Sequence, residues 1–335
     1  MICTIKRGFS LVELLVTLGI ISVLLGLVMP AVQQAREAAR RTACLNNLRQ
    51  LSLASQGFLV TKSHFPGPVV NAWPGTAGYT KDAGFLFELL PYLEQSPLHG
   101  QFDRQSYLHS IANRDRLTTR VSTLYCPSAG DPSGLTNIAS GVSGAVVEGL
   151  DSLTCDYSGS GGVWDFSGRM DGSNGGVVRL RLGNQSGTRV AEVRDGLSST
   201  LLAWESAGDG LYLPGTQGLR QTIQDGAPET FYWRERGGSF QSVGRASSLT
   251  YLYSWCGFRT GSLTAWAPYG VQVSPRTELG RAVNMTNRFG EPFSFHPGGA
   301  NFAYADGAVG FLAEDIDSAL LSYLVSIADG NVASN

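Results

Sequence analysis

The sequence predicts an α+β protein in which a long amino-terminal helix packs on a large, mainly antiparallel β head that ends in a carboxy-terminal helix. One observation is an apolar run near the start that continues as helix-forming sequence; another is a series of short strand-like runs separated by turns. Glycine supplies 42 of 335 residues and only 16% of residues are charged, against about 7% and about 25% in average proteins. This composition is typical of short strands joined by tight turns. The net charge of −2 offers no basic surface for nucleic acid.

The helical segment begins with an apolar run from Phe9 to Met29 whose only charged residue is Glu13. This run is long enough to cross a hydrocarbon layer of roughly 30 Å. We therefore expect a transmembrane helix over residues 9–30 and an amphipathic continuation over 31–58. Gly57 is the expected end, before the break at 66–68. The continuation has one apolar stripe at helical spacing, formed by Cys44, Leu48, Leu51, Ser55 and Phe58.

The head, residues 59–335, is predicted to consist mainly of strands separated by Asp-Gly turns. A short helix is expected over Gly84–Leu93, limited by Pro91. An amphipathic helix is expected over Asp315–Ala328, closed by Gly330, with its apolar face at Ile316, Leu320, Tyr323, Leu324 and Ile327. The strand-like runs lie at 177–182, 200–204, 248–253 and 301–305.

The amino terminus has the pattern of a known leader. Two basic residues precede Gly8-Phe9, and Glu13 follows within the apolar run. This pattern strongly resembles the leader of type IV prepilins and type II secretion pseudopilins. The resemblance implies that a prepilin peptidase/methyltransferase removes residues 1–8 by cleavage after Gly8 and N-methylates Phe9. It also implies that Glu13 pairs with the new amino terminus of a neighbouring pilin-like subunit, and that the helix-kinking proline of the family is Pro30.

Two other interpretations of this segment remain. A secretory signal peptide would need a small-x-small cleavage site, which residues 29–34 do not provide. An uncleaved signal anchor leaves Glu13 unexplained. A carboxylate in a spanning helix needs an explanation, because near the centre of the helix it costs about 2–3 kcal/mol. Basic residues flank both sides of the span, so charge alone does not orient it. The leader resemblance implies a single-pass inner-membrane protein with a cytoplasmic amino terminus and a periplasmic or extracellular head.

A second resemblance comes from three segments of the head, at 124–128, 193–205 and 295–307. The last contains His296, nine residues, and then Asp306-Gly307. These segments are similar to a bacterial family of prepilin-leader proteins with a domain of unknown function and a His-(nine)-Asp-Gly ending. The helix segment at 43–48 resembles that family too. The biochemical role of the family is not established, so the resemblance implies a class of protein and a location, not a reaction.

Without the family, the third segment reads as a hairpin with a two-residue type I′ turn at Asp306-Gly307. A contact between His296 and Asp306 could be structural, could bind a metal or could be a catalytic pair. We favour a structural contact, because a metal needs more ligands than these two. The remaining histidines lie far away in sequence. The chain has no nucleophile elbow, P-loop, H-E-x-x-H or C-x-x-C motif. We therefore expect no enzyme activity, no catalytic residues, no cofactor and no metal.

Cleavage would remove Cys3 and leave Cys44, Cys126, Cys155 and Cys256, an even set in a head expected outside the cytoplasm. Four cysteines allow three pairings. The second resemblance favours Cys44–Cys126, because both lie in family segments and their bond would fasten the long helix to the head. Free buried thiols are the alternative.

These patterns together predict a membrane-anchored subunit of a type IV-like filament or a type II secretion-like assembly, which contacts other pilin-like subunits through its amino-terminal helix. The alternative is a surface-anchored protein that binds a glycan or a protein through its head. Its support is the tryptophans at 164, 233, 255 and 266. A surface hydrolase that uses His296 and Asp306 is a weaker third option.

Overall fold

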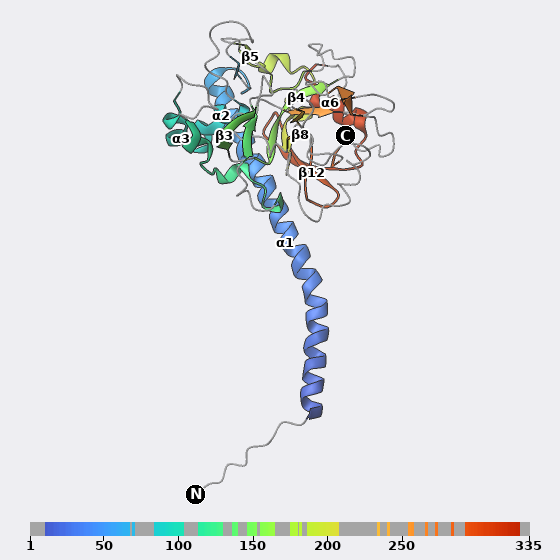
Figure 1. The fold of residues 1–335 in the computed structure, drawn as a ribbon. Coiled ribbons are helices and arrows are strands. Elements are labelled where there is room, and N and C mark those ends of the chain that lie inside the picture. The colour runs from blue at the N-terminus through green and yellow to red at the C-terminus, as the bar shows by residue number, and fades with distance from the viewer. Residues whose placement is uncertain are drawn as a thin grey trace.

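A single long helix, α1 (Leu11–Lys62), projects from a mixed α/β head in the computed structural model (Figure 1). The structure describes residues 11–67, 69–70, 84–103, 113–129, 136–139, 146–152, 155–164, 175–179, 181–182, 186–207, 233–234, 240–241, 254–257, 265–266, 272–273, 283–284 and 292–328. The first part of α1 forms a stalk, and its carboxy-terminal part lies against the head. The α+β fold expected from the sequence is confirmed.

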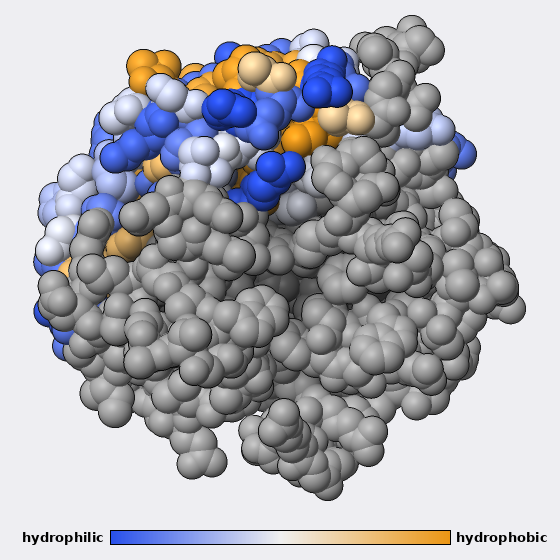
Figure 2. Space-filling view, turned by 90° about the horizontal axis from the view of Figure 1, so that it is seen from above, coloured by the Kyte–Doolittle hydropathy of each residue, from blue (hydrophilic) through white to orange (hydrophobic). Residues whose placement is uncertain are grey.

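The two halves of α1 differ in what surrounds them. From Leu11 to Met29 the large apolar side chains are exposed, and this is the one described helix that is long and apolar enough to cross a membrane. From Cys44 onward one stripe is buried in the head, and it contains every residue predicted for it. Seen from the end opposite the stalk, the described part of the head surface mixes hydrophilic and hydrophobic residues instead (Figure 2). The amino-terminal half of α1 therefore carries a continuous apolar surface that the head does not cover.

The helix does not end at Gly57, as the sequence predicted, but continues to Lys62. A Cβ at Gly57 would lie 3.1 Å from the ring of Tyr92, which belongs to the 3₁₀ helix η1 (Leu90–Leu93). Gly57 thus allows close packing inside the helix instead of capping it. The middle helix is confirmed as α2 (Phe85–Leu89), followed directly by η1, where Pro91 changes the helix type.

The centre of the head is a five-stranded sheet in the order β13-β12-β6-β4-β9. Its strands are β13 (Val309–Ala313), β12 (Gly299–Tyr304), β6 (Leu201–Glu205), β4 (Tyr157–Trp164) and β9 (Ser254–Gly257). Only the β4–β9 pairing within it is parallel. The apolar residues of β12 and β6 are divided between two apolar clusters. The pair Ala203–Ala303 belongs to the cluster that includes α1, and the pair Trp204–Phe302 to the cluster that includes α6 (Ser318–Val325).

The hairpin between β12 and β13 has a different turn from the predicted one. The Gly307 amide donates to the carbonyl of Tyr304, and the Tyr304 amide donates to the carbonyl of Ala308. Only Gly307 has a positive φ, of 102°, and Asp306 does not. The loop therefore has three residues with glycine in the left-handed position, and the type I′ prediction is wrong.

The remaining elements are short. One two-stranded sheet pairs β1 (Val69–Val70) with β5 (Arg181–Leu182) in parallel. The other two-stranded sheets are antiparallel. These other strands are β2 (Thr136–Ala139) with β3 (Val146–Ser152), β7 (Trp233–Arg234) with β8 (Phe240–Gln241), and β10 (Ala265–Trp266) with β11 (Gln272–Val273). Short helices are α3 (Ser96–Gln101), α4 (Arg114–Leu117), η3 (Ser122–Leu124), η4 (Pro127–Ala129), η5 (Val190–Glu192) and η6 (Leu197–Ser199).

One predicted strand and the last helix differ in extent from the prediction, and another predicted strand is not tested. The strand at 177–182 is reduced to β5, and Val177 and Val178 are buried without belonging to a strand. The run at 248–253 lies outside the described residues. Helix α6 is shorter than predicted, and its most deeply buried side chains include Leu321 and Val325, one residue after Leu320 and Leu324 of the predicted face.

Candidate functional site

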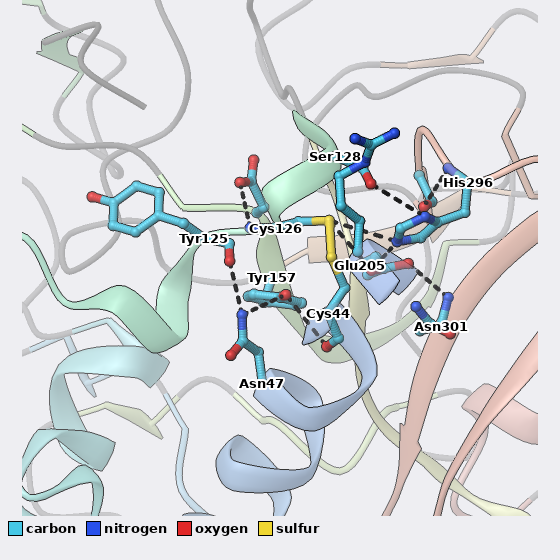
Figure 3. The surroundings of a disulfide bond; sticks show 12 residues. Cys44, Asn47, Tyr125, Cys126, Ser128, Tyr157, Glu205, His296 and Asn301 are labelled. Atoms are coloured by element: carbon cyan, nitrogen blue, oxygen red, sulfur yellow. Dashed lines mark hydrogen bonds and ion pairs between the residues drawn. A yellow bond between two sulfur atoms is a disulfide. The ribbon is translucent and has the colours of Figure 1, made fainter. Parts of the chain in front are cut away.

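A disulfide between Cys44 and Cys126 joins α1 to the segment that leads into η4 (Figure 3). Their Cα atoms are 5.1 Å apart, and the bond spans 82 residues of sequence. Both cysteines are completely buried. The pairing suggested by the family resemblance is therefore confirmed, and it fastens the helix to the head as expected.

His296 lies beside this disulfide, between two carboxylates. Its Nδ1 is 2.6 Å from Oε1 of Glu37, on α1, and its Nε2 is 3.4 Å from Oε1 of Glu205, at the end of β6. The imidazole and Glu205 are fully buried, whereas the Glu37 side chain keeps 24% of its surface exposed. His296 Nε2 and Glu205 Oε1 also each lie 3.7 Å from Sγ of Cys126. Four segments that are distant in sequence thus meet around one imidazole.

The backbone around His296 is shaped by two glycines. Gly298 has a φ of +82°, which L side chains rarely adopt, and a Cβ at Gly299 would lie 2.1 Å from the carbonyl oxygen of Leu312 on β13. Before this turn, the His296 amide donates to Oγ of Ser294. The Pro-Gly-Gly sequence after His296 therefore lets the chain turn sharply into β12 while the imidazole stays buried.

Hydrogen bonds hold each carboxylate in place. Oε2 of Glu205 accepts from the backbone amide of Asn301 at 2.8 Å. The guanidinium of Arg40 lies 2.6 Å from Oε2 of Glu37, and the hydroxyl of Ser128 donates to the same carboxylate at 3.2 Å. Because both oxygens of each carboxylate have partners, the side chains are fixed around the imidazole.

The charges at the site shift the pKa of two groups. Burial by itself lowers the pKa of His296, but the hydrogen bonds and negative charges of Glu205 and Glu37 outweigh it, so this pKa is raised above the ordinary value. Burial raises the pKa of Glu37, but the hydrogen bonds and positive charges of His296 and Arg40 outweigh that effect and lower it. Protonated His296 and Arg40 together balance the two carboxylates, so the charged cluster is compensated within the protein.

A second polar group supports the other side of the disulfide. The hydroxyl of Tyr157 accepts from Nδ2 of Asn47 at 3.1 Å and donates to the carbonyl of Cys44 at 3.4 Å. Burial, followed by the charge of Glu205, raises the pKa of Tyr157 well above its ordinary value, so this residue remains a neutral donor. The amide of Cys126 donates to Oδ2 of Asp156 at 2.9 Å.

The structure separates the two polar residues of the His-(nine)-Asp-Gly segment. His296 contacts the two glutamates, Ser128 and the disulfide, whereas Oδ1 of Asp306 accepts from the amide of Ala308 in the hairpin turn. The anticipated contact between His296 and Asp306 is not among these interactions. Asp306 and Gly307 form the turn, and His296 belongs to the buried cluster.

The other cysteines do not form a second described disulfide. Cys155 is buried and is not part of a disulfide, and its thiol donates to the carbonyl of Tyr157. Cys256 lies on β9, and the structure does not describe its side chain. Gly8 and Phe9 are also outside the described residues, and Glu13 lies exposed in the first turn of α1. The side chains of Trp164, Trp233, Trp255 and Trp266 are likewise not described.

Sequence reasoning did not identify Glu37 and Glu205 as site residues. One signal was present for each of them. Glu37 precedes Cys44 by two helical turns and so shares its face of α1, and Glu205 ends the second family segment. Their convergence on His296 depends on how β6, β12 and α1 pack, which local patterns do not reveal.

Comparisons with known proteins agree with both resemblances. Residues 33–319 match the family described as "Protein of unknown function (DUF1559)", and residues 4–29 match the "Prokaryotic N-terminal methylation motif". No curated protein and no solved structure matches significantly. All residues of the buried cluster lie within the range of the first match. The chain therefore belongs to this family of unknown function, with a prepilin-type methylation motif at its amino terminus.

Proposed function

We propose that this protein is a pilin-like, membrane-anchored subunit of a type IV-like filament or a type II secretion-like assembly, and not an enzyme. In this proposal the prepilin peptidase cleaves after Gly8, Phe9 is N-methylated, and the head faces the periplasm or the cell exterior. The observation that carries the proposal is the combination of the methylation motif over residues 4–29 with an α1 helix whose apolar first half is exposed.

The division of α1 into two halves supports this role. An exposed apolar surface over Leu11–Met29 must be covered by lipid or by other helices. The second half is fastened to the head through Cys44 and Glu37. A force applied to the apolar half is therefore transmitted to the head through a covalent bond, which suits a subunit that is drawn out of a membrane into an assembly.

Processing is tested by mass spectrometry of the full-length protein purified from its native membranes. The expected amino-terminal peptide begins with N-methylated Phe9 and lacks residues 1–8. If the protein from the membranes still begins with Met1, the proposal is contradicted, and the helix would serve only to tether the head to the membrane.

Assembly is tested separately with Glu13→Ala, compared with the control Thr17→Ala. Thr17 is exposed on the same stretch of helix, and its hydroxyl donates to the carbonyl of Leu14 within the helix. We expect both variants to insert into the membrane, but only Glu13→Ala to be depleted from cross-linked assemblies, because the charged amino terminus of a neighbour loses its partner. Equal incorporation of the two variants would refute charge pairing.

A further inference from the structure

We propose that the two cysteines, when they are not joined to each other, form with Glu205 and His296 a four-ligand site for Zn²⁺. The four donor atoms are two Sγ, one carboxylate oxygen and one imidazole nitrogen, and they lie within 4.8 Å of one another. All four residues are buried, with at most 1% of each exposed. Thiolate, imidazole and carboxylate are the donors that Zn²⁺ takes in tetrahedral protein sites.

The distances between the ligand atoms fit a tetrahedral zinc ion. With zinc bonds of about 2.3 Å to sulfur and about 2.0–2.1 Å to nitrogen and oxygen, tetrahedral edges are about 3.4 Å between N and O and about 3.6 Å from S to either. His296 Nε2 is 3.4 Å from Glu205 Oε1, and Cys126 Sγ is 3.7 Å from each of them. Three of the four corners are thus already spaced for the metal. The remaining change is a separation of the two sulfurs from bonding distance to about 3.8 Å.

The groups behind the ligands are those that zinc sites use. Glu37 accepts from Nδ1 of His296 at 2.6 Å, so Nε2, once deprotonated, presents its lone pair toward Cys126, whose Sγ is 3.7 Å away. A carboxylate on the far nitrogen of a ligating histidine fixes its tautomer and raises its basicity. The second oxygen of Glu205 is held by the amide of Asn301, and its first oxygen lies 3.4 Å from His296 Nε2 and 3.7 Å from Cys126 Sγ.

The disulfide and the metal site exclude each other, because each uses both sulfurs. A dithiol reductant passes two electrons and two protons to the Cys44–Cys126 bond, which breaks into two thiols while the reductant closes into its own disulfide. Zn²⁺ then binds the two sulfurs as thiolates and His296 as the neutral imidazole, so three protons are released, one from each thiol and one from the protonated imidazole. Either bond arrangement links α1 to the head, so the helix stays fastened in oxidising and in reducing surroundings.

The experiment uses the full-length protein in detergent, reduced with dithiothreitol, freed of reductant without oxygen, and titrated with Zn²⁺ against a chromophoric chelator. We expect one equivalent of Zn²⁺ to bind to the reduced protein, with release of three protons when His296 starts protonated, and none to bind at this site in the oxidised protein. Co²⁺ in place of Zn²⁺ should give the visible spectrum of a tetrahedral thiolate complex. Equal zinc binding by the oxidised and reduced forms would overturn the proposal.

Variants assign the ligands. His296→Ala and Glu205→Gln should lose tight binding, and Glu37→Gln should weaken it about 10- to 100-fold, as expected for a group behind a ligand. The matched control is Cys155→Ser, which removes a buried thiol outside the cluster and should bind zinc normally. If a variant fails to fold, X-ray absorption spectroscopy of the zinc-loaded wild-type protein identifies the ligands instead. Two sulfur ligands with one imidazole support the site, and a shell without imidazole or with more sulfur refutes it.

Discussion

Removing the Cys44–Cys126 bond should destabilise the head strongly. The bond closes a loop with a sequence separation of 82 residues. In the chain-entropy description, a loop of this length corresponds to about 4.5 kcal/mol at 25 °C, since the cost of closing the unfolded chain grows with the logarithm of loop length. We therefore expect the double variant Cys44→Ala/Cys126→Ala to lose about 4–5 kcal/mol of unfolding free energy.

The assay is urea unfolding of the full-length protein in detergent, with a metal chelator present, followed by tryptophan fluorescence. Trp204 is completely buried in the sheet, so its emission reports the integrity of the core. The control is Cys155→Ala, which removes one buried sulfur without breaking a cross-link and should cost about 1 kcal/mol. If the double variant loses no more than twice the loss of the control, the bond stabilises only by packing, and the reasoning from loop length fails.

Three further predictions concern the buried cluster and the turn beside it. The pKa of His296 is raised above 6.5 in the folded protein, so its contribution to stability is complete below about pH 6.5 and is lost as pH rises through the folded pKa. The pKa of Glu37 is lowered from 4.5, so the contribution of Glu37 to stability is present above about pH 4.5 and is lost as pH falls through its folded pKa. Unfolding measured from about pH 6 to about pH 9 should thus show a smaller fall in stability for Glu37→Gln than for the wild type, and parallel curves would contradict the ion pair. Glu205→Ala should cost about 3–5 kcal/mol in urea unfolding, because it leaves the imidazole charge without its buried partner; a loss below about 1 kcal/mol would argue against a charged cluster. Gly299→Ala should cost at least about 1–3 kcal/mol in thermal unfolding, since its Cβ would collide with a carbonyl of β13, whereas Gly100→Ala, in a helix with open space around it, should be neutral or stabilising.

Local patterns predicted the elements that carry regularly spaced or continuous apolar residues. The stripe of α1 from Cys44 to Phe58 and the strands β6 and β12 follow directly from the spacing of apolar residues. The errors occur where packing overrides a local signal. Gly57 looked like a helix end but accommodates the ring of Tyr92, and Asp306-Gly307 looked like a two-residue turn but belongs to a three-residue loop.

The sequence by itself determined that this chain carries a methylation motif and a membrane-length helix, because fixed spacing and a continuous apolar run are properties of neighbouring residues. Only the tertiary structure decided the partners of His296. Glu37, Cys126 and Glu205 lie on separate elements, and no periodicity relates them to the imidazole. Their meeting depends on the packing of α1 beneath the sheet, where burial makes each charge require a partner and so selects the arrangement in which all of them have one.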